Sequence, residues 1–329
     1  LDGFVMPPRF STGYSTIRNR PGITIETHML KDYRNRVLGT YDLLRFTLEE
    51  LNRNPEKLQR AIREADEQTI KEGESYDPAR PFPLRIELTD KSRPVQFKGL
   101  EARTELSDIS GTMRVVFGTK PQDVTVPLYD ESKVAASVSP PLYYIVPPQW
   151  KSVIDVLKAH GLHLKQTLAP ATIEVESYRF SDVKFASSPF EGRVMPSYKS
   201  NLVRERRNFP AGSVVVPVAQ ASGQVAIHLL EPDAPDSFVA WGFFNAIFEH
   251  KEYGEDYLLE TLAREMLTKD ENLRREFEQK ITSDPKFAAS PSARLNFFFE
   301  RSPYWDKQLN LYPVGRITTP LNIQLADFH

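Results

Sequence analysis

The sequence predicts a mixed α+β protein. Residues 1–75 carry apolar stripes at helical spacing, residues 80–232 carry short runs of β-branched and alternating residues, and residues 233–329 return to helical patterns. By size, a chain of 329 residues holds about two domains. The changes of pattern favour three consecutive parts: a helix-rich first part, a β-sandwich-like accessory second part, and a helical third part that ends in a tail.

The first part, residues 1–75, begins with irregular sequence and a predicted strand at Ile23–Thr27. An amphipathic helix follows, and the dipeptide Asn54-Pro55 predicts the start of another, because asparagine is a favoured N-cap and proline suits the first turn. The apolar face of the earlier helix consists of Leu44, Leu48 and Leu51, at spacings of four and three residues.

The second part, residues 80–232, is rich in β-branched residues separated by turn signals. One helix is predicted within it, from Gln149 to His160, and Gly161 is a suitable C-terminal cap. The predicted strands are Leu84–Leu88, Met113–Phe117, Val124–Leu128, Tyr143–Val146, Ile173–Tyr178, Ser213–Val218 and Val225–Leu230.

The third part, residues 233–329, contains two predicted helix starts, with Asp236 and Asp270 as N-caps. The segment Asn310–Ile317 resembles a return strand or an ordered tail. The predicted apolar faces of the two helices consist of Phe238, Trp241, Phe244 and Phe248 in the first and Leu273, Phe277 and Ile281 in the second.

Composition excludes several classes of function. The 42 basic and 44 acidic residues are well mixed along the chain, and the formal charge is −2. The sequence therefore shows no basic region of the kind that binds nucleic acid or an anionic membrane. No apolar stretch reaches the ~18 residues needed to cross a bilayer, so membrane insertion is not expected. The absence of cysteine excludes disulfides and thiol catalysis, and suits either the cytosol or a compartment where stray thiols are a liability. The compartment stays open, with a periplasmic or secreted location slightly favoured.

One stretch carries a family resemblance. The sequence RNRPGITIETHMLKDYRNRV, followed by TYDLLRFTLEEL, resembles the closing part of the catalytic domain of zinc carboxypeptidases of the carboxypeptidase A type. Residues 1–75 are then the end of an α/β carboxypeptidase-like catalytic domain, and the resemblance assigns Glu26 as the general base. Later stretches resemble a long C-terminal extension found in a bacterial branch of that family: YYIVPPQW, VESYRF, FEGR, GSVVVPVAQ, HLLEPDAPDSF and WGFFNAIFEHKEY.

The resemblance also implies zinc, but not in this chain. The His-x-x-Glu pair and the third histidine of the family lie before the catalytic strand, and only 25 residues precede Glu26 here. We therefore expect zinc as the cofactor of a parent enzyme, with its ligands in a missing N-terminal catalytic part, and no metal bound by this chain. The non-methionine first residue, Leu1, is consistent with a cut chain. The expected partners are a peptide substrate and that missing part.

The candidate site residues each have a competing interpretation. Without the family resemblance, Glu26 is best explained as one partner of a structural ion pair with Arg20, Arg34 or Arg36. The resemblance instead assigns it the role of general base. His28, two residues after Glu26, points to the same side. It either orients Glu26 or lines the pocket, or is a half-buried histidine that hydrogen-bonds a backbone carbonyl. Two weaker substrate-binding candidates precede the strand: Tyr14, as a residue of a covering loop, and Arg18, as a carboxylate-binding or merely packing residue.

Two histidine patterns resemble metal motifs. His228 and Glu231 satisfy His-x-x-Glu, but they close a predicted strand, where residues three apart point to opposite faces. His160 and His163 flank a glycine at a predicted helix end, which a surface turn explains. Neither pattern supplies the third ligand that a zinc site needs, so no metal ligand is predicted.

Two functions from different classes remain open. In the first, the parent is a zinc metallocarboxypeptidase that hydrolyses C-terminal peptide bonds, and this chain alone is inactive because it lacks the zinc ligands. In the second, the chain is a zinc-free module that binds a peptide, a glycan or a protein, and Glu26 is structural.

Overall fold

The centre of the protein is one antiparallel sheet. In the computed structural model, which describes residues 1–328, seven strands lie in the order β11-β6-β9-β5-β10-β7-β8, and every recorded pair is antiparallel. The predicted α+β class is confirmed. The strands are β5 (Tyr143–Val146), β6 (Lys165–Thr167), β7 (Ala171–Phe185), β8 (Pro196–Phe209), β9 (Val214–Pro217), β10 (Gly315–Ile317) and β11 (Leu325–Asp327).

The strand β10 confirms the predicted return strand and closes the sheet from far along the chain. It lies between β5 and β7, where Arg316 is opposite both Tyr144 and Glu176. All three of its residues are buried, which fits a central strand. The sheet therefore combines residues 143–217 with residues 315–327. The division of the chain into three domains, with a β-sandwich-like middle part, stays a prediction.

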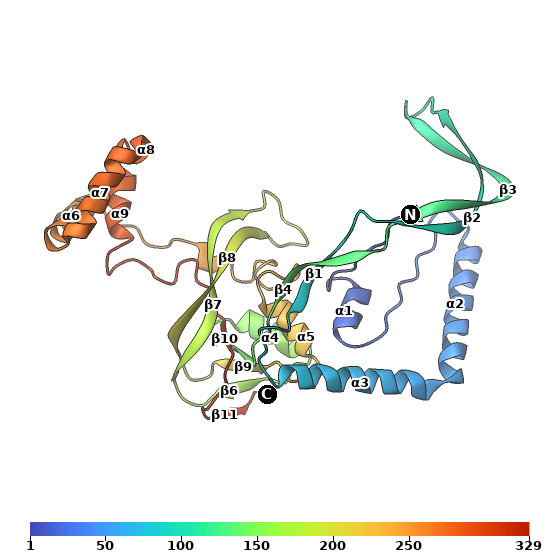
Figure 1. Cartoon of the computed structure of the whole chain (residues 1–329), viewed down its shortest axis with the longest axis horizontal. Helices are drawn as coiled ribbons and strands as arrows, with labels where there is room; N and C mark the ends of the chain where they lie inside the picture. Colours follow the sequence, from blue (N-terminus) through green and yellow to red (C-terminus); the bar gives the residue numbers. More distant parts are fainter. Residues whose placement is uncertain (329) are drawn as a thin grey trace.

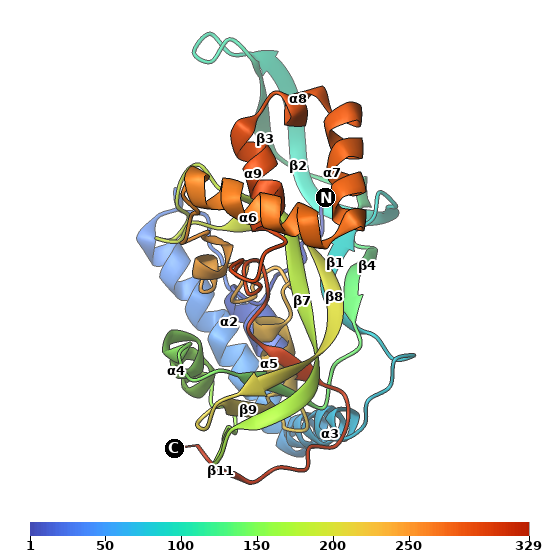
Figure 2. The ribbon, with the colours of Figure 1, turned by 90° about the vertical axis from the view of Figure 1, so that its left-hand side faces the viewer.

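Two helices and the turns after them cover one face of this sheet. They are α4 (Lys151–Ala159), which ends before Gly161 at φ +70°, and α5 (Gly223–Leu230). Figure 2 shows both helices beside the long curved β7–β8 hairpin. The predicted helix at Gln149–His160 is thereby confirmed, whereas the predicted strand Val225–Leu230 is wrong. An apolar run this short fits either a buried strand or a buried helix, and packing against the sheet decides for the helix.

Two antiparallel ribbons extend from the body, as Figure 1 shows. The inner ribbon pairs β1 (Phe82–Leu88) with β4 (Ser132–Val138), and the outer one pairs β2 (Arg93–Leu106) with β3 (Met113–Leu128). The predicted strands at Leu84–Leu88, Met113–Phe117 and Val124–Leu128 lie within them. The last two belong to the single long strand β3, which pairs with β2 on both sides of one register shift between Leu100 and Ala102.

The N-terminal helices are α1 (Ser11–Ile17), α2 (Tyr33–Arg53) and α3 (Pro55–Gly73). The two predicted helices are confirmed as α2 and α3, but α2 buries none of its residues. The far end of α3 packs tightly on the body, because a Cβ on Gly73 would come within 2.6 Å of the Val218–Ala219 backbone. In contrast, the predicted strand Ile23–Thr27 is wrong: these residues form no regular structure, and Ile23 is 67% exposed.

The C-terminal helices form a small lobe with a core of its own. They are α6 (Asp256–Lys269), α7 (Glu271–Ser283), α8 (Pro285–Ala288) and α9 (Pro291–Phe299), and two extended connections join them to the sheet (Figure 1). Asp270 caps α7 as predicted. The prediction of a helix after Asp236 is wrong: these residues form a series of turns with the short 3-10 helix η1 (Asn245–Phe248). The Asp236 carboxylate accepts hydrogen bonds from Arg9 and the Trp241 ring nitrogen instead of capping a helix. Among residues 1–328, no helix combines the length and apolarity required to cross a membrane.

The cap at Asp270 gives a prediction with a matched control. Its side chain accepts hydrogen bonds from the backbone nitrogens of Asn272 and Leu273, whereas Asn54, at the start of α3, makes no side-chain capping bond. We expect Asp270→Ala to destabilise its helix by about 1 kcal/mol, and Asn54→Ala to change stability far less. Urea unfolding followed by circular dichroism checks this, and equal losses in the two variants would contradict it.

Candidate functional site

Glu26 lies in an exposed, irregular segment between α1 and α2. Its carboxylate is exposed and makes no hydrogen bond or ion pair with residues 1–328. His28 is also exposed, and its Nδ1 accepts a hydrogen bond from the Leu30 backbone nitrogen at 3.1 Å. The expected alignment of His28 with Glu26 rested on the strand Ile23–Thr27. That strand is missing because, among the described residues, no other strand pairs with its backbone groups.

The two weaker candidates lie together, but not with Glu26. The Tyr14 hydroxyl is 2.8 Å from Nδ1 of His160, and Arg18 Nη1 donates to the His160 carbonyl oxygen at 2.9 Å and to Ser222 Oγ at 2.7 Å. Both residues thereby hold α1 against the end of α4 and the start of α5. Burial, and then the nearby Arg18 charge, lower the pKa of His160. A substrate-binding role for Tyr14, Arg18 and His28 stays a prediction.

The His-x-x-Glu pair lies on a helix, not on a strand. His228 belongs to α5, and Glu231 is the residue at which that helix ends. The expectation that the pair closes a β-run is therefore wrong. The two side chains enter different surroundings: the His228 ring packs against the Phe82 ring in a T-shaped pair, whereas Glu231 is fully buried in a polar network beneath the helix.

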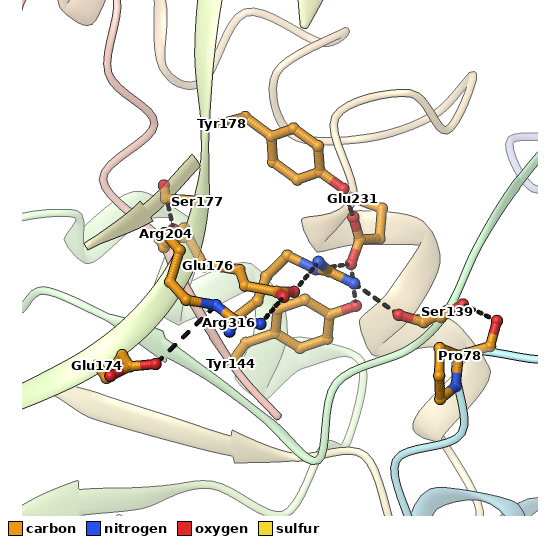
Figure 3. A network of polar contacts seen from close by, with 11 residues as sticks. Pro78, Ser139, Tyr144, Glu174, Glu176, Ser177, Tyr178, Arg204, Glu231 and Arg316 are labelled. Atoms are coloured by element: carbon orange, nitrogen blue, oxygen red, sulfur yellow. Dashed lines mark hydrogen bonds and ion pairs between the residues drawn. The ribbon is translucent and has the colours of Figure 1, made fainter. Parts of the chain in front are cut away.

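Figure 3 shows this buried network. The Glu231 carboxylate accepts hydrogen bonds from the Tyr144 hydroxyl at 2.6 Å, the Tyr178 hydroxyl at 2.7 Å and Arg316 Nε at 2.9 Å. Arg316 Nη1 also pairs with Glu176 at 2.7 Å, and Arg316 Nη2 donates to a backbone carbonyl. Burial raises the pKa of Tyr144 well above its ordinary value, so its hydroxyl remains a donor.

The network is structural because solvent does not reach its centre. Tyr144 and Glu231 are 0% exposed, and Arg316 is 3% exposed. Its members join β5, β7 and β10 to the end of α5, which fixes the helix on the sheet. Sequence reasoning missed it, since Arg316 lies 177 positions after Ser139, whose carbonyl oxygen it binds, and 85 positions after Glu231. The only local signal is one glutamate directly after an apolar run.

The described residues do not fit a zinc site. Among residues 1–328, no three or more His, Cys, Asp or Glu side chains are close enough to hold one metal ion. His228 and Glu231 lack a third ligand, and Glu231 is already bound by Arg316 and two tyrosines.

His228 predicts a pH dependence of stability. Burial lowers its pKa from 6.5 to about 4, partly offset by the negative charge of Asp236. Between these two values the unfolded chain binds the extra proton and the folded chain does not, so stability falls as the pH falls from about 6.5 to 4. The loss from this residue is on the order of 3 kcal/mol. We expect urea unfolding at pH 7 and pH 4.5 to show a smaller difference for His228→Phe than for the unchanged protein; equal differences would contradict the assignment.

Comparison with known proteins links part of the chain to carboxypeptidases. Over 104 residues the chain is 30% identical to Carboxypeptidase 2 of Trichophyton tonsurans and of Trichophyton equinum, and 29% identical to Carboxypeptidase 2 of Trichophyton rubrum. The aligned region is 32% of this chain and 19% of each relative, so the chain spans about a fifth of the relatives' length. No family model and no solved structure matches. Part of this chain is thus related to carboxypeptidases, which are peptide hydrolases.

Proposed function

We propose that this chain is part of a zinc metallocarboxypeptidase that hydrolyses C-terminal peptide bonds, with Glu26 as its general base. The observation that carries the proposal is the similarity of 104 residues to fungal carboxypeptidases. The segment around Glu26 supports it through its resemblance to the closing part of the carboxypeptidase A catalytic domain. Because the described residues do not fit a zinc site, the ligands in this proposal lie outside residues 1–328.

The surroundings of Glu26 suit a base better than a structural ion pair. Arg20, one of its possible partners, instead donates two hydrogen bonds to Asp66, at 2.9 and 3.0 Å, and this contact lowers the pKa of the Asp66 carboxyl. The Glu26 carboxylate is left exposed. A carboxylate in this state can take a proton from an attacking water and deliver it to the leaving amine, a role typically worth about 10²–10⁴ in rate.

The exposed face of α2 supports a covering partner. The helix lies away from the central sheet (Figure 1), and its large apolar side chains recur at spacings of four and three residues while remaining at least 40% exposed. A continuous apolar stripe of this kind marks an interaction surface. In our proposal the N-terminal catalytic part packs on it. The stripe consists of Val37, Tyr41, Leu44, Leu48 and Leu51.

The deciding experiment replaces Glu26 by glutamine in an active enzyme that contains this chain. Glutamine keeps the shape of the side chain and removes only its ability to accept the proton. Loss of peptide hydrolysis with zinc content retained supports the proposal.

A further inference from the structure

A groove runs beside strand β1. Its cavity of about 600 Å³ lies between the N-terminal segment Phe4–Pro8, helix α1, β1 and the start of α5. A second cavity of about 220 Å³ adjoins it, since the two share Pro8, Ile17 and His228 as lining residues. The walls of the larger cavity are mostly apolar, and Glu26 lines neither cavity.

The groove follows the edge of β1. Six consecutive residues, 82–87, line it, although neighbouring residues of a strand point to opposite faces. No residue of the paired strand β4 lines it. A cavity that touches both faces of one strand and none of its neighbour lies along the strand's outer edge. Among residues 1–328, β1 pairs with β4 alone, so outward backbone groups remain free for another strand.

His228 supplies a polar group in this apolar groove. The residue is only 7% exposed, and its side chain makes no hydrogen bond with residues 1–328. Its Nδ1 is fully enclosed without a partner, whereas Nε2 is not among the enclosed atoms and is therefore the nitrogen that a bound molecule can reach. An imidazole nitrogen at the wall of an apolar groove, without a hydrogen bond from residues 1–328, favours an occupant that brings a polar backbone group to it.

We propose that the groove binds an extended polypeptide segment with apolar side chains, which adds to β1 as a further strand and hydrogen-bonds to His228. Strand addition provides backbone hydrogen bonds for affinity, and alternate side chains enter pockets for specificity. The neighbouring cavity, with Phe238, Trp241 and Phe243 in its wall, accommodates one large apolar side chain. This goes beyond the proposed function, since binding here requires neither Glu26 nor zinc.

The test uses the 329-residue chain and four labelled octapeptides with blocked ends. Each alternates lysine with one apolar residue: valine, isoleucine, leucine or phenylalanine. Fluorescence anisotropy measures binding, and nitrogen NMR of the histidines reports on His228. We expect at least one peptide to bind with a dissociation constant of about 1 mM or lower and to shift the His228 signal. Methylation of the peptide's backbone nitrogens that face β1 should lower its affinity roughly tenfold, because those nitrogens can no longer donate hydrogen bonds to the strand.

Ile86 and Val134 provide a matched pair of variants. They are cross-strand partners on β1 and β4, both exposed (42% and 58%), but only Ile86 lines the groove. We expect Ile86→Glu to weaken peptide binding roughly tenfold or more and Val134→Glu to leave it within about twofold. Circular dichroism confirms that both variants are folded.

Several outcomes would overturn the proposal. Failure of all four peptides to bind at millimolar concentration would do so, as would equal losses in Ile86→Glu and Val134→Glu, or equal affinity for the methylated peptide. A dimer of the chain that Ile86→Glu dissociates would make the occupant a second copy instead. Glu26→Gln must leave peptide binding unchanged, so the failure of Glu26 as a base and the failure of this groove are distinguishable.

Discussion

Replacing Arg316 by methionine is expected to lower the free energy of unfolding by about 3–5 kcal/mol, because it leaves buried carboxylates without their cation. Methionine keeps most of the apolar stem, but the hydrogen bonds to Glu231, Glu176 and the Ser139 carbonyl are lost. Native domains are stable by only about 5–15 kcal/mol, so this is a large fraction of the total. Urea unfolding followed by tyrosine and tryptophan fluorescence measures the loss.

Arg204 is the matched control for Arg316. It also pairs with Glu176, at 3.0 Å, but its side chain is 63% exposed. An exposed pair is worth about 0–1 kcal/mol, so Arg204→Met is expected to be nearly neutral.

If Arg316→Met itself destabilises too far for measurement, the triple variant with Glu176→Gln and Glu231→Gln should regain stability, since no uncompensated charge remains. Losses below 1 kcal/mol in Arg316→Met would show that the buried charges are not balanced by this residue.

Replacing Glu26 by glutamine is expected to lower kcat for peptide hydrolysis by about 10²–10⁴ in an active enzyme that contains this chain. The substitution removes proton transfer and leaves the side chain's size, so KM and zinc content should change little. Because Glu26 is exposed and makes no ion pair or hydrogen bond with residues 1–328, the melting temperature should also stay close to that of the unchanged enzyme. Steady-state kinetics, elemental analysis and thermal unfolding together test this expectation.

Glu64 is the control for a general effect of losing a carboxylate. It is exposed on α3 and makes no ion pair or hydrogen bond with residues 1–328, so Glu64→Gln should keep full activity. An active Glu26→Gln enzyme with a lowered melting temperature would instead make Glu26 a structural residue and remove it from catalysis.

Local patterns were sufficient for the helices α2, α3, α4 and α7 and for strands such as β1, β5, β7 and β9. The stripes of α2 and α3, the cap at Asp270 and the glycine after α4 are all determined within a few residues, where spacing and backbone preference act directly. The buried runs of β5, β7 and β9 were also found, because β-branched residues between turn signals are typical of strands. These features follow from interactions between near neighbours in the chain.

Features that depend on residues far apart in the sequence could not be predicted from local patterns. Ile23–Thr27 has the composition of a strand, but a strand requires a neighbour for its backbone groups, and residues 1–328 supply none. Val225–Leu230 became a helix because the sheet offered an apolar face that such a helix covers. Glu26 was selected through a family resemblance and not through its own surroundings. The groove beside β1 had no local signal, since it combines residues from positions 4 to 243.

The sequence by itself determined the α+β class, the positions of α2, α3, α4 and α7 and of strands such as β5, β7 and β9, and, through a family resemblance, the choice of Glu26 as a candidate base. Only the tertiary structure decided that Glu231 binds Arg316, that β10 closes the sheet, and that His228 faces a groove. The physical reason is the range of the forces involved. Helical periodicity and caps are set by residues a few positions apart, whereas strand pairing, buried ion pairs and cavities join residues that only folding brings together.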